Sequence, residues 1–389
     1  MYSNSIFGDL VKLLPGDAVA ESVARHDGDK WRKRFKTYDH LLAMLAGQLA
    51  GAGSLRELET VFNAETNHHY HLRTDRVSRS TLADANRGRP AAVFRDIARD
   101  VIGLAGRKQR RAGEIVSILD STPVRLCGRG HAWADETRPG NPGLKVHVQM
   151  DHGTQHLVWA EISDNRMNDI TKAREIPLEA GHVYVFDKGY CDYNWWKAIA
   201  DKGSRFVTRL KRNAAFETVE TRKIANQDDG FILQDRVIRL CNKNPGARRR
   251  NLLTGAPLRL VRIKHPKGEA RPFWIVSNDL EAPASQIAHW YKARWAIELL
   301  FKWIKQNLKI KKFMGESRNA VMIQIYVAII AYVLLKLYHG LNTRPETVRL
   351  KDMVSLVRTH LFSRPKIQAR RRQRIDQQNK DQLVLWNAT

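Results

Sequence analysis

Cysteine is scarce in this sequence of 389 residues, which has three cysteines far apart from one another. An odd and widely spaced set excludes a disulfide framework and a CxxC zinc module, and it is typical of a protein from a reducing compartment. The first ten residues, MYSNSIFGDL, contain no basic segment followed by an apolar run. We therefore expect no signal peptide.

Long apolar runs are scarce as well. The longest extends from Ala320 to Leu335 and is interrupted by Gln324. Its 16 residues fall short of the ~20 that an α-helix needs to cross a bilayer. We therefore predict a buried core helix and no membrane association.

Acidic residues are outnumbered: 66 Lys and Arg against 40 Asp and Glu give a formal net charge of +26. Such an excess indicates a polyanionic partner. By segment, the net charge is +6 over 1–112, −4 over 113–187, +16 over 188–313 and +8 over 314–389. Basic surfaces hold a phosphate backbone, whereas clustered carboxylates repel it unless cations lie between them. The combination predicts a metal-dependent enzyme that acts on nucleic acid.

The chain exceeds the ~250–300 residues at which one hydrophobic core stops growing, so several domains are expected. Its ends have helical patterns, whereas short runs of Val, Ile and aromatic residues in its centre predict strands. Three strands, a helix and a fourth strand follow the order of the front of a ribonuclease H-like sheet. The predicted segments are a helical N-terminal DNA-binding region (1–112), the first part of an α/β core (113–202), a β-rich insertion (203–281), a core helix (282–313), a helical C-terminal region (314–363) and a basic tail (364–389).

Two aspartates lie in apolar strand contexts. Asp120 lies within SILDSTPV, and Asp187 follows the apolar run VYVF and precedes KGY. A buried strand avoids charge unless the charge is compensated. A single aspartate at a strand end is more often a turn residue, but a pair on adjacent strands could share divalent ions. The matching contexts favour metal ligation.

A third carboxylate belongs to a predicted helix at 284–310. At about 100° per residue, one stripe of this helix carries a phenol, a guanidinium, a carboxylate and two amines. These residues are Tyr291, Arg294, Glu298, Lys302 and Lys305. A solvated helix face explains the two lysines. It does not explain one acid placed among bases at the edge of an apolar face.

The pattern Tyr291-x2-Arg294-x3-Glu298-x6-Lys305 resembles the YREK signature of bacterial insertion-sequence transposases with a DDE catalytic triad. LDSTPV resembles the strand of the first aspartate in that family, and DKGY resembles its second-aspartate motif. Lys188 stands where many relatives have arginine, which keeps the positive charge but loses bidentate binding of phosphate.

The resemblance implies an α/β fold: a ribonuclease H-like catalytic core with a β-rich insertion and with helical N-terminal and C-terminal regions. It implies catalysis and metal binding by Asp120, Asp187 and Glu298, with two Mg²⁺ ions and with Mn²⁺ as a substitute. Trp274 resembles a tryptophan that stacks on a flipped base, although it could equally be a core aromatic. With Lys302 from the stripe, the predicted DNA contacts are Tyr291, Arg294, Lys302, Lys305, Trp274 and Lys188.

The implied function is that of a transposase that binds the inverted-repeat ends of its element, cuts them and joins them to target DNA. A DNA-bound homodimer in the cytoplasm of a bacterium, associated with the nucleoid, is expected. One alternative is a catalytically inactive DNA-binding regulator derived from a transposase, and another is a related ribonuclease H-like nuclease. The intact acidic triad argues against the first alternative. The helical stripe and the β insertion argue against the second.

Four other polar residues are not expected in the site. His147 alternates with valines on a strand, which predicts a half-buried structural histidine. Asp164 and Asp169 follow a strand, where they are expected to make turn or cap contacts. Cys191 has no histidine motif beside it, so we do not expect it to act as a nucleophile.

Overall fold

The computed structural model describes residues 5–108, 114–126, 129–135, 142–224, 230–241, 251–264, 272–308, 313–342 and 350–363. The predicted basic tail at 364–389 lies outside these residues. The chain forms two compact units. The first comprises residues 1–105, 127–133 and 303–389, and the second comprises residues 106–126 and 134–302. The N-terminal and C-terminal helical regions therefore belong to one unit.

Helices build the first unit. They are α1 (Ile6–Val11), α2 (Gly16–Arg25), α3 (Thr37–Ala50), α4 (Leu55–Ala64), α5 (Thr66–Leu72), α6 (Arg79–Gly88), most of α7 (Ala91–Lys108), the 3-10 turn η1 (Arg129–His131), the start of α8 (Ala132–Asp135), the end of α12 (Trp295–Asn307), α13 (Arg318–Asn342) and α14 (Leu350–His360). Helix α13 is the centre of this unit, since α3, α6, α14 and α1 all pack against it.

Helix α13 contains the longest apolar run. It has 25 residues, so it extends beyond the run at both ends and is long enough to cross a membrane. The length of the apolar run therefore does not exclude a membrane span, contrary to expectation. The burial of the helix is what distinguishes a core helix from a membrane-spanning one. The most apolar window of the helix has a mean hydropathy of 2.2 and is 89% buried inside the protein. Burial on all sides by neighbouring helices is the arrangement of a core helix.

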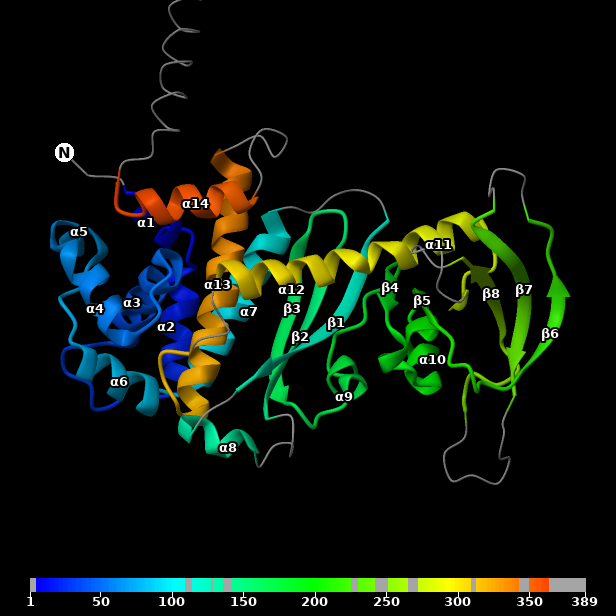
Figure 1. The fold of residues 1–389 in the computed structure, drawn as a ribbon, viewed down its shortest axis with the longest axis horizontal. Helices are drawn as coiled ribbons and strands as arrows, with labels where there is room; N and C mark the ends of the chain where they lie inside the picture. Colours follow the sequence, from blue (N-terminus) through cyan, green and yellow to red (C-terminus); the bar gives the residue numbers. More distant parts are fainter. Residues whose placement is uncertain are drawn as a thin grey trace, which may run out of the picture. The chain divides into compact units, whose positions relative to one another are not determined.

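Among its described residues, the second unit contains one sheet of nine strands in the order β3-β2-β1-β4-β5-β9-β8-β7-β6 (Figure 1). The pairs β1–β4 and β4–β5 are parallel, and the other neighbours are antiparallel. The strands are β1 (Val116–Arg125), β2 (Gly143–Asp151), β3 (His156–Asp164), β4 (Val183–Phe186), β5 (Arg205–Arg209), β6 (Phe216–Thr221), β7 (Ile232–Leu240), β8 (Pro257–Ile263) and β9 (Phe273–Ser277).

The expected insertion extends the core sheet instead of forming a separate one. Strand β5 lies within the segment expected to be the insertion, but it pairs in parallel with β4. Its central residues Phe206 and Val207 are both fully buried, so it needs cover on both faces, as parallel strands do. Strands β6 to β9 then continue the sheet, with β9 antiparallel to β5.

Helices cover this sheet on two faces. One face carries Tyr184, Phe186, Phe206 and Val276, which pack in a single cluster with Trp196 of α10 (Tyr193–Asp201). We call it the α10 face; η2 (Lys188–Tyr190) and α9 (Asp169–Ala173) also contribute to it. Helix α11 (Ala284–Ala293) contacts β4, β5, β8 and β9, and we call the opposite face the α11 face.

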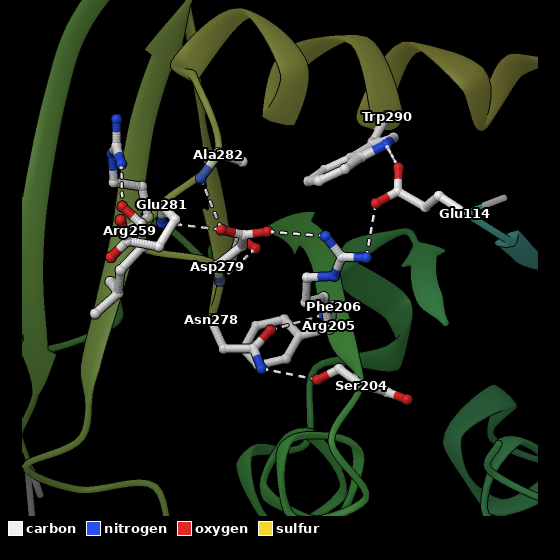
Figure 2. A network of polar contacts seen from close by, with 12 residues as sticks. Glu114, Ser204, Arg205, Phe206, Arg259, Asn278, Asp279, Glu281, Ala282 and Trp290 are labelled. Atoms are coloured by element: carbon white, nitrogen blue, oxygen red, sulfur yellow. Dashed lines mark hydrogen bonds and ion pairs between the residues drawn. The ribbon is translucent and has the colours of Figure 1, made fainter. Parts of the chain in front are cut away.

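A polar network anchors α11 to the sheet (Figure 2). Trp290 of α11 donates to Glu114 at 2.9 Å, and Arg205 of β5 forms an ion pair with the same carboxylate at 2.6 Å. Arg205 also pairs with Asp279 at 3.2 Å, and Asp279 accepts hydrogen bonds from the amides of Glu281 and Ala282, just before the helix. The network fixes the start of α11 over β5.

Candidate active site

The register of two parallel strands brings the first two predicted acids together. Leu119 of β1 is paired with Phe186 of β4, so Asp120 and Asp187 are the next residues on neighbouring strands. Leu119 and Phe186 both belong to the cluster on the α10 face. Because side chains alternate along a strand, Asp120 and Asp187 point to the α11 face.

Residues from α11 and α12 reach these acids from above the sheet. The Tyr291 hydroxyl donates a long hydrogen bond to Asp187 Oδ1 at 3.4 Å. The Arg294 guanidinium donates to Asp120 Oδ2 at 3.3 Å and to Glu298 Oε1 at 2.6 Å. Five of the predicted residues are thus joined by direct contacts, and we call them the carboxylate site.

The helix that carries this site is interrupted where the sequence predicts a continuous one. Helices α11 and α12 are separated by Arg294, which keeps right-handed helical angles of −51° and −30°. The amide of Arg294 bonds to the carbonyl of Tyr291, and the amide of Ile297 bonds to that of Arg294. These i to i+3 bonds make a tighter turn than an α-helix. Arg294 therefore occupies a local break between the two helices.

The charges of the site perturb its proton affinities. The pKa of Asp120 is raised to about 6, mainly by burial and in part by the charges of Asp187 and Glu298, while the Ser121 amide and Arg294 act to lower it. Burial also raises the pKa of Tyr291 to about 12. The side chains of Asp120 and Arg294 are 19% and 15% exposed, whereas that of Glu298 is 36% exposed. The site is thus a partly buried group in which acids outnumber the one cation.

The donor chemistry of the site fits a divalent cation. Its acidic side chains offer carboxylate oxygens, which are the ligands that Mg²⁺ prefers. Burial, and after it the charges of Asp187 and Glu298, raise the pKa of Asp120, so its charged form is unfavourable and a bound cation would stabilise it. Within the described part of the chain, no three acidic, histidine or cysteine side chains are grouped closely enough to hold an ion, and Arg294 lies between Asp120 and Glu298.

Three predicted DNA-contacting lysines lie outside these contacts. Lys188 is exposed and begins η2 directly after Asp187. Lys302 is exposed on α12, one turn after Glu298. Lys305 is partly exposed and belongs to the first unit, whereas the carboxylate site belongs to the second.

Trp274 lies on the opposite face of the sheet from Tyr291. The preceding residue, Phe273, has its ring 5.7 Å from that of Tyr291, so the alternation along β9 turns Trp274 to the α10 face. There the half-buried indole packs against the aromatic cluster. The guanidinium groups of Arg236 and Arg262 lie 5.5 and 5.6 Å from its ring centre. Trp274 is thus a platform for two arginines.

Behind Asp120 lies a polar group that the sequence analysis did not assign to the site. The Ser121 hydroxyl donates to Asp169 at 2.7 Å, and Lys145 lies 3.1 Å from the same carboxylate oxygen. The expected cap role of Asp169 was wrong, since Asn168 is the N-cap of α9 and no side chain caps this helix. Lys145, His147 and Gln149 alternate with apolar residues along β2, and this polar face of a largely buried strand was the available signal.

His147 and Cys191 were not expected in the site. His147 was predicted to be half-buried but is buried, and burial lowers the pKa of its imidazole to about 4. Its Nε2 is 2.8 Å from the Ser163 hydroxyl, which is a structural contact between β2 and β3. Burial raises the pKa of the Cys191 thiol, which disfavours the nucleophilic thiolate.

Comparisons with known proteins match the chain to one family. Residues 111–334 match the "Transposase DDE domain", and residues 2–72 match a domain of unknown function. The "Putative transposase y4zB" of Sinorhizobium fredii is 40% identical over 281 residues, covering 70% of this chain and 75% of the relative. The "Putative transposase for insertion sequence element IS4SA" of Synechocystis sp. is 30% identical over 289 residues, covering 68% and 73%.

Among solved structures, the piggyBac transposase in a synaptic complex with hairpin DNA aligns with a TM-score of 0.49 and 13% identity, over 94% of this chain and 81% of that one. The family match covers more than half of the chain, and both bacterial relatives are named as putative transposases. This favours an enzyme over the inactive regulator considered above. The chain belongs to the DDE transposases and is a transposase of an insertion sequence, a metal-dependent enzyme that cuts DNA and transfers its strands.

Proposed function

We propose that Asp120, Asp187 and Glu298 are the catalytic residues of this transposase and bind its metal ions, two Mg²⁺ or Mn²⁺. One observation carries the proposal. Asp120 and Asp187 follow paired residues of β1 and β4, and Arg294 joins Asp120 to Glu298. Three carboxylates around one guanidinium leave a net negative charge that divalent ions would neutralise.

The bound ions would supply activation of water and then of a 3′-hydroxyl, and stabilisation of the leaving oxygen during in-line attack on a phosphodiester. The chain's own residues would orient the DNA. Tyr291 keeps its proton at neutral pH, because its pKa is about 12, so its hydroxyl can donate a hydrogen bond to a phosphate oxygen. Arg294 presents paired N–H groups, which suit a phosphate as well as a carboxylate.

We propose a ribonuclease H-like core for this enzyme. The order β3-β2-β1-β4-β5, with β2 antiparallel and β4 and β5 parallel to β1, supports it. The β-rich insertion then begins after β5 and returns through β9 to α11. Because the insertion shares the core sheet, it can carry DNA contacts at a fixed distance from the carboxylate site.

DNA is the partner of this enzyme, and we propose that it binds the terminal inverted repeats of its element and the target DNA. Lys188, Lys302 and Lys305 would contact phosphates beside the cleaved end, with Tyr291 and Arg294. The helical region at 1–112 would add contacts to the element's end. A homodimer that pairs two ends, in the cytoplasm of a bacterium and associated with its nucleoid, is the assembly we propose.

Trp274 would act in DNA binding together with Arg236 and Arg262. Both guanidiniums lie near its ring, and neither forms an ion pair with another residue in the described part of the chain. Two half-buried cations without a carboxylate partner suit a phosphate of the DNA backbone. β9 starts at the edge where β5 ends, and Asp187 follows β4 at that edge. A DNA strand leaving the carboxylate site could therefore reach these residues.

The test of the proposed triad is cleavage by Asp120→Ala, Asp187→Ala and Glu298→Ala. Each should abolish Mg²⁺-dependent cutting of the element's ends, because the ions lose a ligand, while gel shifts show end binding largely unchanged. Asp201→Ala is the control, since Asp201 forms an exposed pair with Lys197 on α10. Near wild-type cutting by any one of the three variants removes that residue from the triad.

A further inference from the structure

The polar group behind Asp120 connects three elements of the second unit. Asp169 comes from α9, Ser121 from β1 and Lys145 from β2. One carboxylate oxygen of Asp169 accepts from the Ser121 hydroxyl at 2.7 Å and lies 3.1 Å from Lys145 Nζ. The side chains of Lys145 and Asp169 are 14% and 25% exposed. We call these three residues the Asp169 network.

The network reaches Asp120 through one backbone amide. The Ser121 amide donates to Asp120 Oδ1 at 2.8 Å, while the Ser121 hydroxyl, on the other face of the strand, is bonded to Asp169. Burial raises the pKa of Asp120, so the charged form of this carboxylate is destabilised. A hydrogen bond to the charged form of a carboxylate fixes its orientation and favours that form.

The same carboxylate lies beside the turn that follows Asp187. A β-carbon on Gly189 would lie 3.6 Å from the other oxygen of Asp169, Oδ2. Burial, and then the charges of Asp169 and Asp120, raise the pKa of the Tyr190 hydroxyl well above its usual value, and α9 contacts both β1 and η2. Asp169 is therefore packed against the segments that carry both Asp120 and Asp187.

Lys145 makes this arrangement possible. A partly buried carboxylate needs a compensating charge, and Lys145 supplies it while donating to the Met167 carbonyl at 2.9 Å. Asp169 thus contacts Ser121 and Lys145, with His147 Nδ1 3.7 Å from the same oxygen, and it faces the α10 side of the sheet. Arg294, the cation of the carboxylate site, pairs with Asp120 and Glu298 and not with Asp169. Asp169 can therefore affect the reaction only indirectly, through the segments of β1 and η2 against which it packs.

We propose that Asp169, with Lys145 as its counter-ion, is a positioning residue of this transposase. It holds Ser121, whose amide orients the Asp120 carboxylate toward the ions. The proposal rests on the proposed role of Asp120 as a metal ligand. Residues that orient a metal ligand in this way change metal affinity or activity by ~10–100-fold when they are removed.

The experiment measures Mn²⁺ affinity by electron paramagnetic resonance and end cleavage by the full-length protein, for Asp169→Asn, Ser121→Ala and Ser121→Thr. Asp169→Asn and Ser121→Ala should weaken Mn²⁺ binding and lower kcat by ~10–100-fold, with the KM for DNA ends unchanged. Ser121→Thr keeps the hydroxyl and should restore both values to near wild type. Cleavage by Asp169→Asn should recover in part at high Mg²⁺.

Asp192→Asn is the matched control, because Asp192 is also a partly buried acid on the α10 side, ion-paired with Arg174 and bonded to the Trp195 amide. It should lower the Tm without changing Mn²⁺ affinity. Wild-type Mn²⁺ affinity in Asp169→Asn and Ser121→Ala, together with an inactive Asp120→Ala, overturns this inference and leaves the proposed function intact. Cutting by Asp120→Ala overturns the metal-binding role of Asp120 and this inference with it.

Discussion

Two buried charged clusters of the sheet, one in the insertion and one in the parallel half, differ in their balance of positive and negative charge. In the insertion, Asp235 of β7 and Arg259 of β8 are 3% and 6% exposed and form a two-pronged ion pair. Arg259 donates a further hydrogen bond to the Leu280 carbonyl at 2.8 Å. In the parallel half, Asp120 and Glu298 share the single guanidinium of Arg294, and Asp187 accepts a hydrogen bond from Tyr291. The Asp235–Arg259 pair balances its charges, and the carboxylate site keeps an excess of one sign.

The difference separates a structural pair from a functional group. A buried ion pair is tolerated when its geometry and extra hydrogen bonds offset the loss of hydration, as they do for Asp235 and Arg259. Burial, with like charges nearby, destabilises a charged carboxylate and raises its pKa, as at Asp120. Such an arrangement is typical of sites that receive a charge from outside, here a metal ion. The balance of charge in a buried cluster therefore distinguishes a structural pair from a functional site better than the number of charges does.

The largest effect expected from this comparison is on stability in the insertion. Asp235→Ala leaves the Arg259 guanidinium buried without its carboxylate, so it should lower the free energy of unfolding by ~3–5 kcal/mol. Urea denaturation of the full chain measures this change. Asp201→Ala, which removes an exposed pair, is the control and should stay within ~0.5 kcal/mol of wild type. Equal stabilities of the two variants would contradict the structural role of the insertion pair.

Replacing an acid of the carboxylate site, in the parallel half, should change the free energy of unfolding in the opposite direction. The pKa of Asp120 is raised from 3.8 to about 6 in the folded protein, so the charged carboxylate destabilises the fold. Stability from the protonated form is present below about pH 4 and is lost as the pH rises through about 6. In EDTA, the free energy of unfolding of Asp120→Asn should therefore rise relative to that of wild type between pH 4 and pH 7, by ~2–3 kcal/mol at most.

Thermal unfolding at pH 4, 5, 6 and 7 without divalent ions tests this difference. Asp235→Asn serves as the reference, because it removes a paired acid and should be less stable than wild type at pH 7. If Asp120→Asn is also destabilised at pH 7 by a similar amount, the carboxylate site is balanced like the insertion pair. The distinction between the halves then fails.

The sequence allowed the carboxylate site to be predicted because each acid left a local signal. Asp120 and Asp187 stand in apolar strands, where an uncompensated charge is costly, and Glu298 stands among bases on one helix stripe. Their contacts with Arg294 and Tyr291 follow from parallel pairing and from helical spacing. These are short-range rules, and they operate within a few residues of each acid.

Other features depended on partners that are distant in the chain. Strand β5, which lies in the segment expected to be the insertion, pairs in parallel with β4, and no local pattern specifies this pairing. Asp169 has the context of a helix-start residue, and its actual role depends on Ser121 and Lys145, 48 and 24 residues away in sequence. The break at Arg294 and the side of the sheet on which Trp274 lies are likewise set by packing.

The smallest effects are expected at the arginines of the insertion, where a phosphate would be the missing partner. Arg262→Gln or Arg236→Gln should each reduce the salt dependence of DNA binding, by ~0.7–0.9 in the slope of log K against log[salt] for each phosphate that the variant no longer neutralises. Arg239→Gln is the matched control, because Arg239 is exposed on the same strand as Arg236 but three residues away, on the opposite face.

Fluorescence anisotropy with labelled end DNA from 50 to 300 mM KCl gives these slopes. Trp274→Phe keeps an aromatic platform and should leave the slope unchanged, whereas Trp274→Ala releases both guanidiniums and should lower the slope toward that of the arginine variants. If the slope falls equally in Arg239→Gln, the insertion contributes only diffuse positive charge. If the slope falls in none of the variants, Arg236 and Arg262 are structural residues. Their charges are then compensated within the protein, as those of Asp235 and Arg259 are.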